Sequence, residues 1–226
     1  MVNEEQPKFN EEQIAAAEKQ IVEQSKRIEF YITEYTIEIL ALKRCLDAVS
    51  KSVINRSTHP SHLSDCLRRE WVRFIARTHT ELNYENRLES TLKLCDHLVQ
   101  KLPISNFEVE KGAGGSWDDN AITKISTRLG FSLKISPDVY QGVKRPFRND
   151  KGALEFIKQL RNELAHGSLS FAECGEGVTV SDLRQLTERA SLYLREVVAC
   201  FKSSIDAYQF LMPEQRPKRV KEGTKP

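Results

Sequence analysis

The sequence lacks the features that mark membrane proteins, secreted proteins and zinc ribbons. No run of about 18 apolar residues occurs, and the acidic, polar segment 1–13 has no apolar stretch of the kind that a signal peptide needs. The five cysteines are odd in number, scattered and never in a Cys-x-x-Cys pair. These absences predict a cytoplasmic protein with reduced thiols and no membrane segment.

Several classes of enzyme lack support in the same way. The glycine-rich stretch 112–115 has neither the Gly-Lys-Ser/Thr ending of a P-loop nor the preceding strand and spacing of a dinucleotide fingerprint, so we interpret it as a linker. No Gly-x-Ser-x-Gly elbow and no His-Glu-x-x-His pair occurs. NTPase, serine hydrolase and zinc-protease chemistry is therefore not indicated, and no cofactor is expected.

An excess of charge of one sign is also missing. The 34 basic and 32 acidic residues leave a net charge of +2, which does not by itself indicate a nucleic-acid-binding protein. Any attraction for phosphate must come from local clusters of basic residues. With 39% hydrophobic and 29% charged residues over 226 positions, the chain is expected to fold around a core of its own.

What the sequence does contain is apolar residues at helical spacing. Over 10–49 they recur every seven residues, with a second apolar position in each repeat: Ile14, Ile21, Ile28, Tyr35, Leu42 and Val49, accompanied by Ile32, Ile39 and Leu46. This pattern predicts one long helix. Its apolar seam either faces the core of its own subunit or pairs with another chain.

Further helices are predicted over 63–78, 88–102, 122–129, 151–166 and 183–208. Their expected start signals are Ser116 with Asp119, Asp150 and Ser181, and their expected stop signals are Pro103, Gly130, Gly167 and Pro213. The segment 131–150 contains two prolines and is predicted to be a basic, irregular connection. The fold class is therefore all-α, a helical bundle with a long N-terminal helix and irregular loops.

The predicted domain organisation is simple. Residues 1–213 form a single helical domain, in which 1–9 is a flexible N-terminus. Residues 214–226 carry five basic side chains without apolar periodicity and are predicted to be a disordered basic tail. Such a tail is either inert or weakly attracted to RNA.

Two groups of basic residues are candidates for RNA binding. Arg69, Arg73 and Arg77 fall on successive turns of one predicted helix, so that their guanidinium groups line one face. The irregular connection adds a second group, Lys144, Arg145 and Arg148. Each group either is merely solvated or contacts phosphates, and a protein that binds nucleic acid without chemistry is one alternative function.

The sequence His59-x-x-His62, followed by Asp65 and Cys66, superficially resembles a metal site. Its position at the start of a predicted helix explains the same residues as a turn, a cap and a core-facing thiol. We therefore predict no metal site.

The strongest chemical signal is the segment Leu-Arg-Asn-Glu-Leu-Ala-His-Gly at 160–167. Asn162 and His166 are four residues apart on one helical face, and Arg161 is adjacent. RNA cleavage without a metal needs a base, an acid and a cation for the charge that develops on the phosphate. One copy of this segment supplies half of that set, whereas two copies meeting across a two-fold axis supply all of it.

This segment resembles the motif of the HEPN superfamily, the higher eukaryotes and prokaryotes nucleotide-binding domains, whose ribonuclease members carry an Arg and then a His near a helix end. The wider run 160–175 is similar to the MAE-HEPN branch, in which Arg-Asn-x-Leu-Ala-His-Gly precedes a Ser-Phe loop, a Val-Thr-type segment and a final helix. The resemblance covers the C-terminal half of the chain best.

The resemblance implies a HEPN-like helical bundle, a homodimer, and RNA cleavage that leaves a 2′,3′-cyclic phosphate at a composite Arg161, Asn162 and His166 site. It also implies a toxin or phage-defence role, with an antitoxin or a defence-system protein as a partner. One alternative is structural, with Arg161 and Asn162 bonding the chain around the helix end and His166 capping it. Another is a non-catalytic helical module that binds a partner protein, a nucleotide or RNA.

Overall fold

The computed structural model of the chain describes residues 11–57, 59–76, 83–111, 117–168 and 178–218. Within these ranges every regular element is a helix, and the only β-type pairings recorded there are two isolated bridges, Leu63 with Leu211 and Arg148 with Lys151. The all-α fold class is confirmed.

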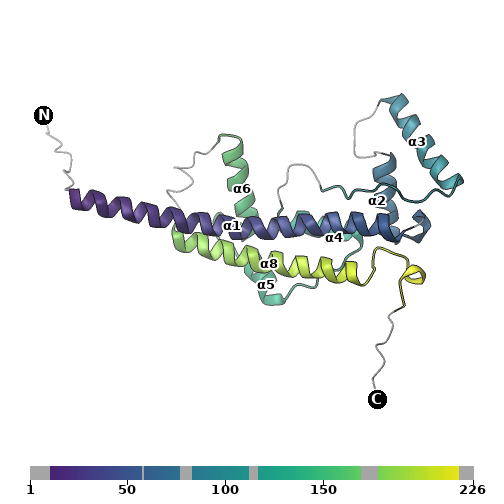
Figure 1. Cartoon of the computed structure of the whole chain (residues 1–226). Helices are drawn as coiled ribbons and strands as arrows, with labels where there is room; N and C mark the ends of the chain where they lie inside the picture. The colour runs from purple at the N-terminus through teal and green to yellow at the C-terminus, as the bar shows by residue number, and fades with distance from the viewer. Residues whose placement is uncertain (1–10, 58, 77–82, 112–116, 169–177, 219–226) are drawn as a thin grey trace, which may run out of the picture.

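Two long helices, α1 (Glu11–Arg56) and α8 (Val180–Asp206), lie side by side and form the axis of the molecule (Figure 1). They run in the same direction, because Arg195 pairs with Glu38 (2.7 Å) at one end and the Arg56 guanidinium lies 5.7 Å from the Tyr208 ring centroid at the other. Their facing apolar side chains form the centre of the core, including Leu42, Leu46, Val49, Leu194, Val197 and Phe201, each fully buried.

The seam of α1 divides into two parts. From Leu42 onward it is buried against α8, so the interpretation as a core-facing stripe is confirmed there. The N-terminal part extends beyond the start of α8 (Figure 1), and Ile14 and Val22 are about half exposed, at 48% and 54%. These two side chains therefore face solvent in the single subunit.

Shorter helices surround this axis. They are η1 (Pro60–His62), α2 (Asp65–Ala76), α3 (Tyr84–Val99), α4 (Asp119–Leu129), α5 (Pro137–Lys144), α6 (Ala153–Ala165) and η3 (Pro213–Gln215). Helix α2 packs on α4 and α3, whereas α5 and α6 both pack on α8. In Figure 1, α6 and the α2–α3 pair rise on the same side of α1 at separate places along it.

The expected connection over 131–150 was wrong, because α5 lies within it. Pro137 occupies the first turn of α5, where a proline needs no N–H partner, so the residue interpreted as a breaker is a helix start. Ser136 fixes this start by donating from its N–H and its hydroxyl to Glu196 of α8, both at 2.6 Å.

Three predicted helix starts were also wrong. Helix α4 is capped by Asp118, whose carboxylate accepts from the Ala121 N–H at 2.7 Å, and Ser116 lies outside the described residues. Helix α6 begins after Gly152, because Asp150 has a φ of +55° in the preceding turn. Helix α8 begins after Thr179, which forms a capping box with Asp182, so Ser181 is inside the helix.

The predicted stops at Gly130 and Gly167 are confirmed, since both glycines have positive φ values (72° and 69°) directly after their helices. The first predicted helix runs further than 49, to Arg56. The beginning of the predicted tail is described as far as Lys218, with Pro213–Gln215 in a 3-10 turn and the Arg216 guanidinium donating to the Leu211 carbonyl at 3.1 Å. In the described part of the chain, no helix is both long and apolar enough to cross a membrane.

Two phenols, the buried Tyr193 and the half-buried Tyr35, should make the fold sensitive to alkali. Burial raises the pKa of Tyr35 and Tyr193 from 10.0 to about 12. An unfolded phenol ionises near pH 10 while the folded one keeps its proton, so their stabilising effect is complete below pH about 10 and is lost as the pH rises through about 12. Because Tyr193 is almost fully buried, we expect it to contribute up to about 2–3 kcal/mol of this loss.

Urea unfolding between pH about 8 and 11 measures this effect, with Tyr193→Phe as the comparison. The variant should lose less stability over that range than the parent protein. An identical loss in both proteins would contradict the assignment to Tyr193.

Candidate active site

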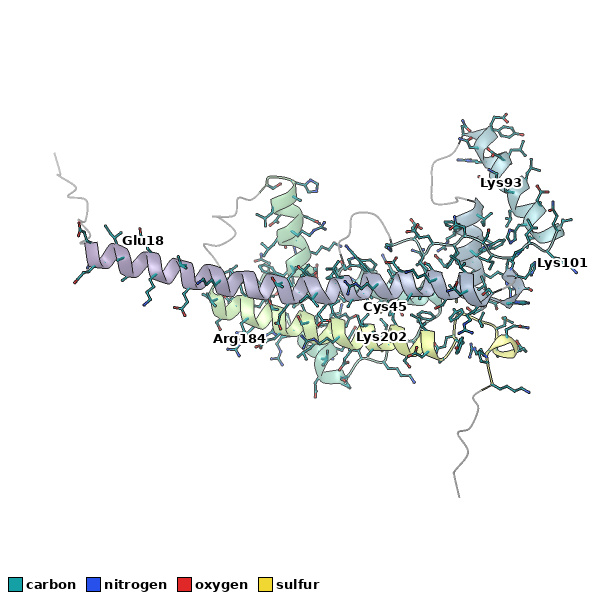
Figure 2. All side chains as sticks on the ribbon, viewed as in Figure 1. Glu18, Cys45, Lys93, Lys101, Arg184 and Lys202 are labelled. Atoms are coloured by element: carbon teal, nitrogen blue, oxygen red, sulfur yellow. The ribbon has the colours of Figure 1, made fainter. Side chains whose placement is uncertain are left out.

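Helix α6 carries the Arg161, Asn162 and His166 motif away from the body of the molecule. Its first turn is buried through Ala153, Leu154 and Phe156, and exposure increases along the helix until Ala165 and His166, which are exposed. Figure 1 shows the far end of α6 standing clear of α1 and α8, and Figure 2 shows its side chains projecting into open space. The motif therefore lies at the tip of a projecting helix.

Local hydrogen bonds set the geometry of this tip. The His166 N–H donates to the Asn162 carbonyl at 2.9 Å, the Gly167 N–H to Leu164 at 3.2 Å, and the Ser168 N–H to Glu163 at 2.9 Å. The last two bonds form a Schellman motif, which requires the positive φ that glycine adopts without strain. His166 is thereby fixed as the residue that ends the helix, four positions after Asn162.

Replacing Gly167 by alanine should destabilise this helix end by about 1 kcal/mol, because the added Cβ strains a φ of +69° although no atom lies within 4 Å of it. The expected signature is faster amide exchange at Gly167 and Ser168 with the rest of the fold unchanged. Wild-type exchange rates at those amides would contradict the assigned role of Gly167.

The side chains of the motif differ in exposure. Arg161 and His166 are exposed and Asn162 is half-buried, and both Arg161 and Asn162 have interactions within the described chain. The charge of Arg161 acts on the Tyr35 phenol of α1, whose pKa it lowers against the larger effect of burial. Tyr35 therefore stays protonated near the motif. No local pattern could predict this neighbour, because 126 residues separate it from Arg161.

The remaining polar residues of α6 anchor the helix and are not part of the motif. The Lys158 ammonium donates to the Asp118 carboxylate at 2.6 Å, so α6 is tied to the cap of α4. Burial raises the pKa of Asp118, but the hydrogen bonds from Lys158 and the Ala121 N–H together hold it below its ordinary value. On a neighbouring face, Gln159 accepts from Lys151 and donates to Glu163 at 2.6 Å.

The predicted RNA-binding residues of the second group lie near the other end of α6. Lys144 pairs with Asp119, and this hydrogen bond raises the Lys144 pKa. Arg148 is 3.4 Å from Asp182 and stacks over Phe147. Arg145 is exposed and has no ion pair or side-chain hydrogen bond recorded within the described residues. Of the three, Arg145 is the side chain best placed to contact a phosphate.

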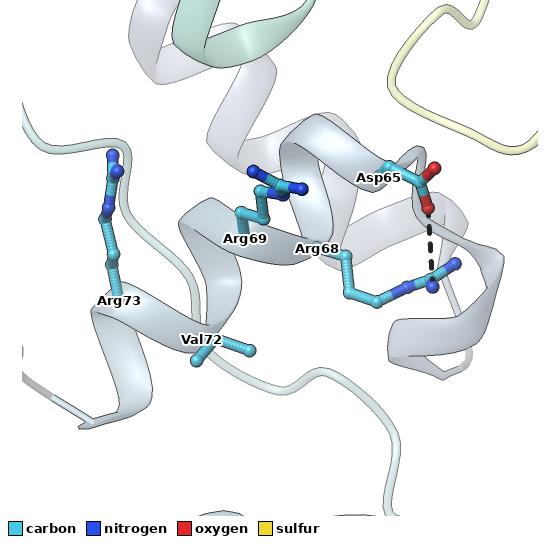
Figure 3. A pocket seen from close by; sticks show the side chains of 5 residues that line it. All are labelled: Asp65, Arg68, Arg69, Val72 and Arg73. Atoms are coloured by element: carbon cyan, nitrogen blue, oxygen red, sulfur yellow. Dashed lines mark ion pairs between the residues drawn. The ribbon is translucent and has the colours of Figure 1, made fainter.

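The first group lies on α2, apart from α6. Arg69 and Arg73 line an open cavity of about 650 Å³ together with Asp65, Arg68 and Val72 (Figure 3). Arg73 donates to the buried Glu70 carboxylate at 2.6 Å, whereas the Arg69 guanidinium is exposed above the cavity. Arg77 lies outside the described residues. The structure therefore does not bring the arginine row and the α6 motif together within one subunit.

No cluster with the geometry of a metal site occurs among the described histidine, cysteine, aspartate and glutamate side chains. His59 instead caps η1, with its Nδ1 accepting from the Ser61 N–H at 3.2 Å. The half-buried Cys66 packs against the core.

Comparison with known protein families gives one informative result. The profile of a family described as MAE_28990-like HEPN matches residues 41–210, about three quarters of the chain. The match begins where α1 becomes buried and includes all of α6 and α8. Comparisons with curated proteins and with solved structures found no match.

Proposed function

This chain belongs to the MAE_28990-like HEPN family, and from that membership we propose that it is a metal-independent endoribonuclease that acts as a homodimer. The observation that carries the proposal is the position of Arg161, Asn162 and His166 at the exposed tip of α6, inside the matched segment. A tip that projects from the body can meet the same tip of a second subunit, so that two imidazoles and two guanidinium groups surround one phosphate.

In the proposed reaction, one His166 imidazole removes the proton of the ribose 2′-hydroxyl. The 2′-oxygen attacks phosphorus, and the bond from phosphorus to the 5′-oxygen breaks to leave a 2′,3′-cyclic phosphate. His166 of the second subunit, in its protonated form, donates a proton to the departing 5′-oxygen. Arg161 stabilises the charge on the phosphoryl oxygens, and Asn162 orients the phosphate or the imidazole.

The partners follow from the same proposal. RNA is the substrate. We expect Arg145 and Arg69 to add affinity for RNA by contacting phosphates other than the one that is cleaved. A toxin or phage-defence role requires control, and the exposed tip of α6 is a surface that an antitoxin or a defence-system protein can cover.

The test is incubation of the purified protein with end-labelled RNA in EDTA, followed by analysis of fragment size and 3′-end chemistry. Discrete fragments ending in cyclic phosphate support the proposal. Cleavage that needs an added divalent metal contradicts the metal-independent mechanism. Intact RNA that remains bound to the protein favours the rival function, a non-catalytic binding module.

A further inference from the structure

Helix α3 is amphipathic, but its apolar face points away from the body of the molecule. Its half-buried side chains, Ser90, Leu94 and His97, face the body, where the His97 ring lies 4.9 Å from the Trp71 ring. No residue of α3 is buried. The opposite face carries its largest apolar side chains together with those that follow the helix, which we call the α3 stripe: Tyr84, Leu88, Leu92, Leu98, Val99 and Leu102.

The exposure of the α3 stripe is large. Tyr84 is 75% exposed, Leu92 56% and Val99 81%. Together the stripe presents roughly 600 Å² of mostly apolar surface, at the upper end of what single-subunit proteins leave uncovered. Because apolar area of this size is costly in water, the stripe is expected to be a contact surface.

The stripe is close to a palindrome. When a second α3 is laid against it in the opposite direction, Leu88 faces Leu98 of the second copy, and Tyr84 comes next to the segment that follows the helix, which carries Leu102. Leu92 and the exposed Cys95 lie at the centre. In this register Leu88 and Leu98 are apolar partners, whereas Val99 lies opposite Arg87 of the second copy. A two-fold contact needs such a largely self-complementary order.

Charge supports the same pairing. The first turn of α3 carries Glu85, and Lys101 follows the last turn, and both are exposed. In the antiparallel arrangement Glu85 of one copy lies opposite Lys101 of the other. Complete cover of both stripes would bury on the order of 1,200 Å², the lower limit of specific protein interfaces.

We propose that the α3 stripe is a two-fold interface at which a second copy of this chain packs its own α3 in antiparallel orientation. This interface is separate from the tip of α6, because the two projections stand apart along α1 (Figure 1). A chain with two different two-fold surfaces assembles beyond the dimer. The α3 pairing does not depend on the ribonuclease function.

The first test is the molar mass in solution, measured by light scattering during size-exclusion chromatography. The double variant Leu92→Glu, Val99→Glu should show a molar mass at least twofold lower than that of the parent protein, because charge on both stripes prevents the contact. Leu192→Glu is the matched control, since Leu192 is a similarly exposed leucine (50%) on α8, outside the stripe. The control should keep the parent mass, and all proteins should keep the same helical content.

The second test examines the orientation. Glu85→Lys should weaken association, and combining it with Lys101→Glu should restore the parent mass. Failure of the combined variant to restore it would overturn the antiparallel arrangement. The interface itself would be overturned by a double variant that keeps the parent mass. It would equally be overturned by a parent protein that has the mass of one chain. Either result would assign the stripe to a helix of another protein.

Discussion

Replacing His166 by alanine is expected to lower RNA cleavage by about 10²–10⁴-fold while RNA binding and the mass of the assembly stay unchanged. The imidazole is the group of the motif whose chemistry suits both a general base and a general acid. Its exposure at the end of α6 means that its removal leaves no cavity and costs little folding stability. The loss should therefore appear in the rate constant for cleavage and not in the affinity for RNA.

The matched control is His62→Ala, which removes a half-buried histidine of η1. It should cleave at the parent rate. Single-turnover cleavage of a labelled RNA, at protein concentrations that saturate binding, separates the two effects. A His166→Ala variant that cleaves at the parent rate would exclude the proposed acid–base role, and equal losses in both variants would indicate a general loss of structure.

Replacing Glu70 by glutamine is expected to cost about 3 kcal/mol of folding stability, the largest single effect on the fold that we predict. The Glu70 carboxylate is buried (side chain 3% exposed) and accepts from Arg73 and from two nitrogens of Arg128. The Glu70 hydrogen bond is the main cause of the raised Arg128 pKa. Without the negative charge, two guanidinium groups lose the carboxylate that they share at the junction of α2 and α4, and Arg128 keeps its longer pair with Glu110 (3.6 Å).

The control is Glu89→Gln, which removes an exposed carboxylate from a one-turn ion pair with Lys93 on α3. Such a pair contributes only about 0.2–0.5 kcal/mol. Urea unfolding of both variants gives the two free energies on one scale. A Glu70→Gln variant no less stable than Glu89→Gln would show that the buried carboxylate is not what joins α2 to α4.

Local sequence was sufficient for the elements whose signals are complete within a few residues. The heptad pattern predicted α1, and the Gly130 and Gly167 stops were correct because a helix end depends on hydrogen bonds between residues at most five positions apart. The spacing of Arg161, Asn162 and His166 on one turn is likewise local. These features would be the same in any fold that kept α6 helical.

Helix starts were less predictable, and the reason is competition between neighbouring polar residues. Thr179 and Ser181 are both good caps, and only the reciprocal bond with Asp182 selects Thr179. Pro137 fits a turn as well as a helix start. The hydrogen bonds from Ser136 to Glu196 of α8 stabilise the helix start.

The sequence by itself determined the helical class, the motif and its place at a helix end. Only the tertiary structure decided that Ile14 near the start of α1 is exposed, that α3 turns its apolar face outward, and that Tyr35 lies near Arg161. It also decided which basic residues form ion pairs within the subunit, since Lys144 pairs with Asp119 and Arg148 pairs with Asp182. Periodicity states which side of a helix is apolar, but which helix covers that side depends on contacts between residues far apart in the chain.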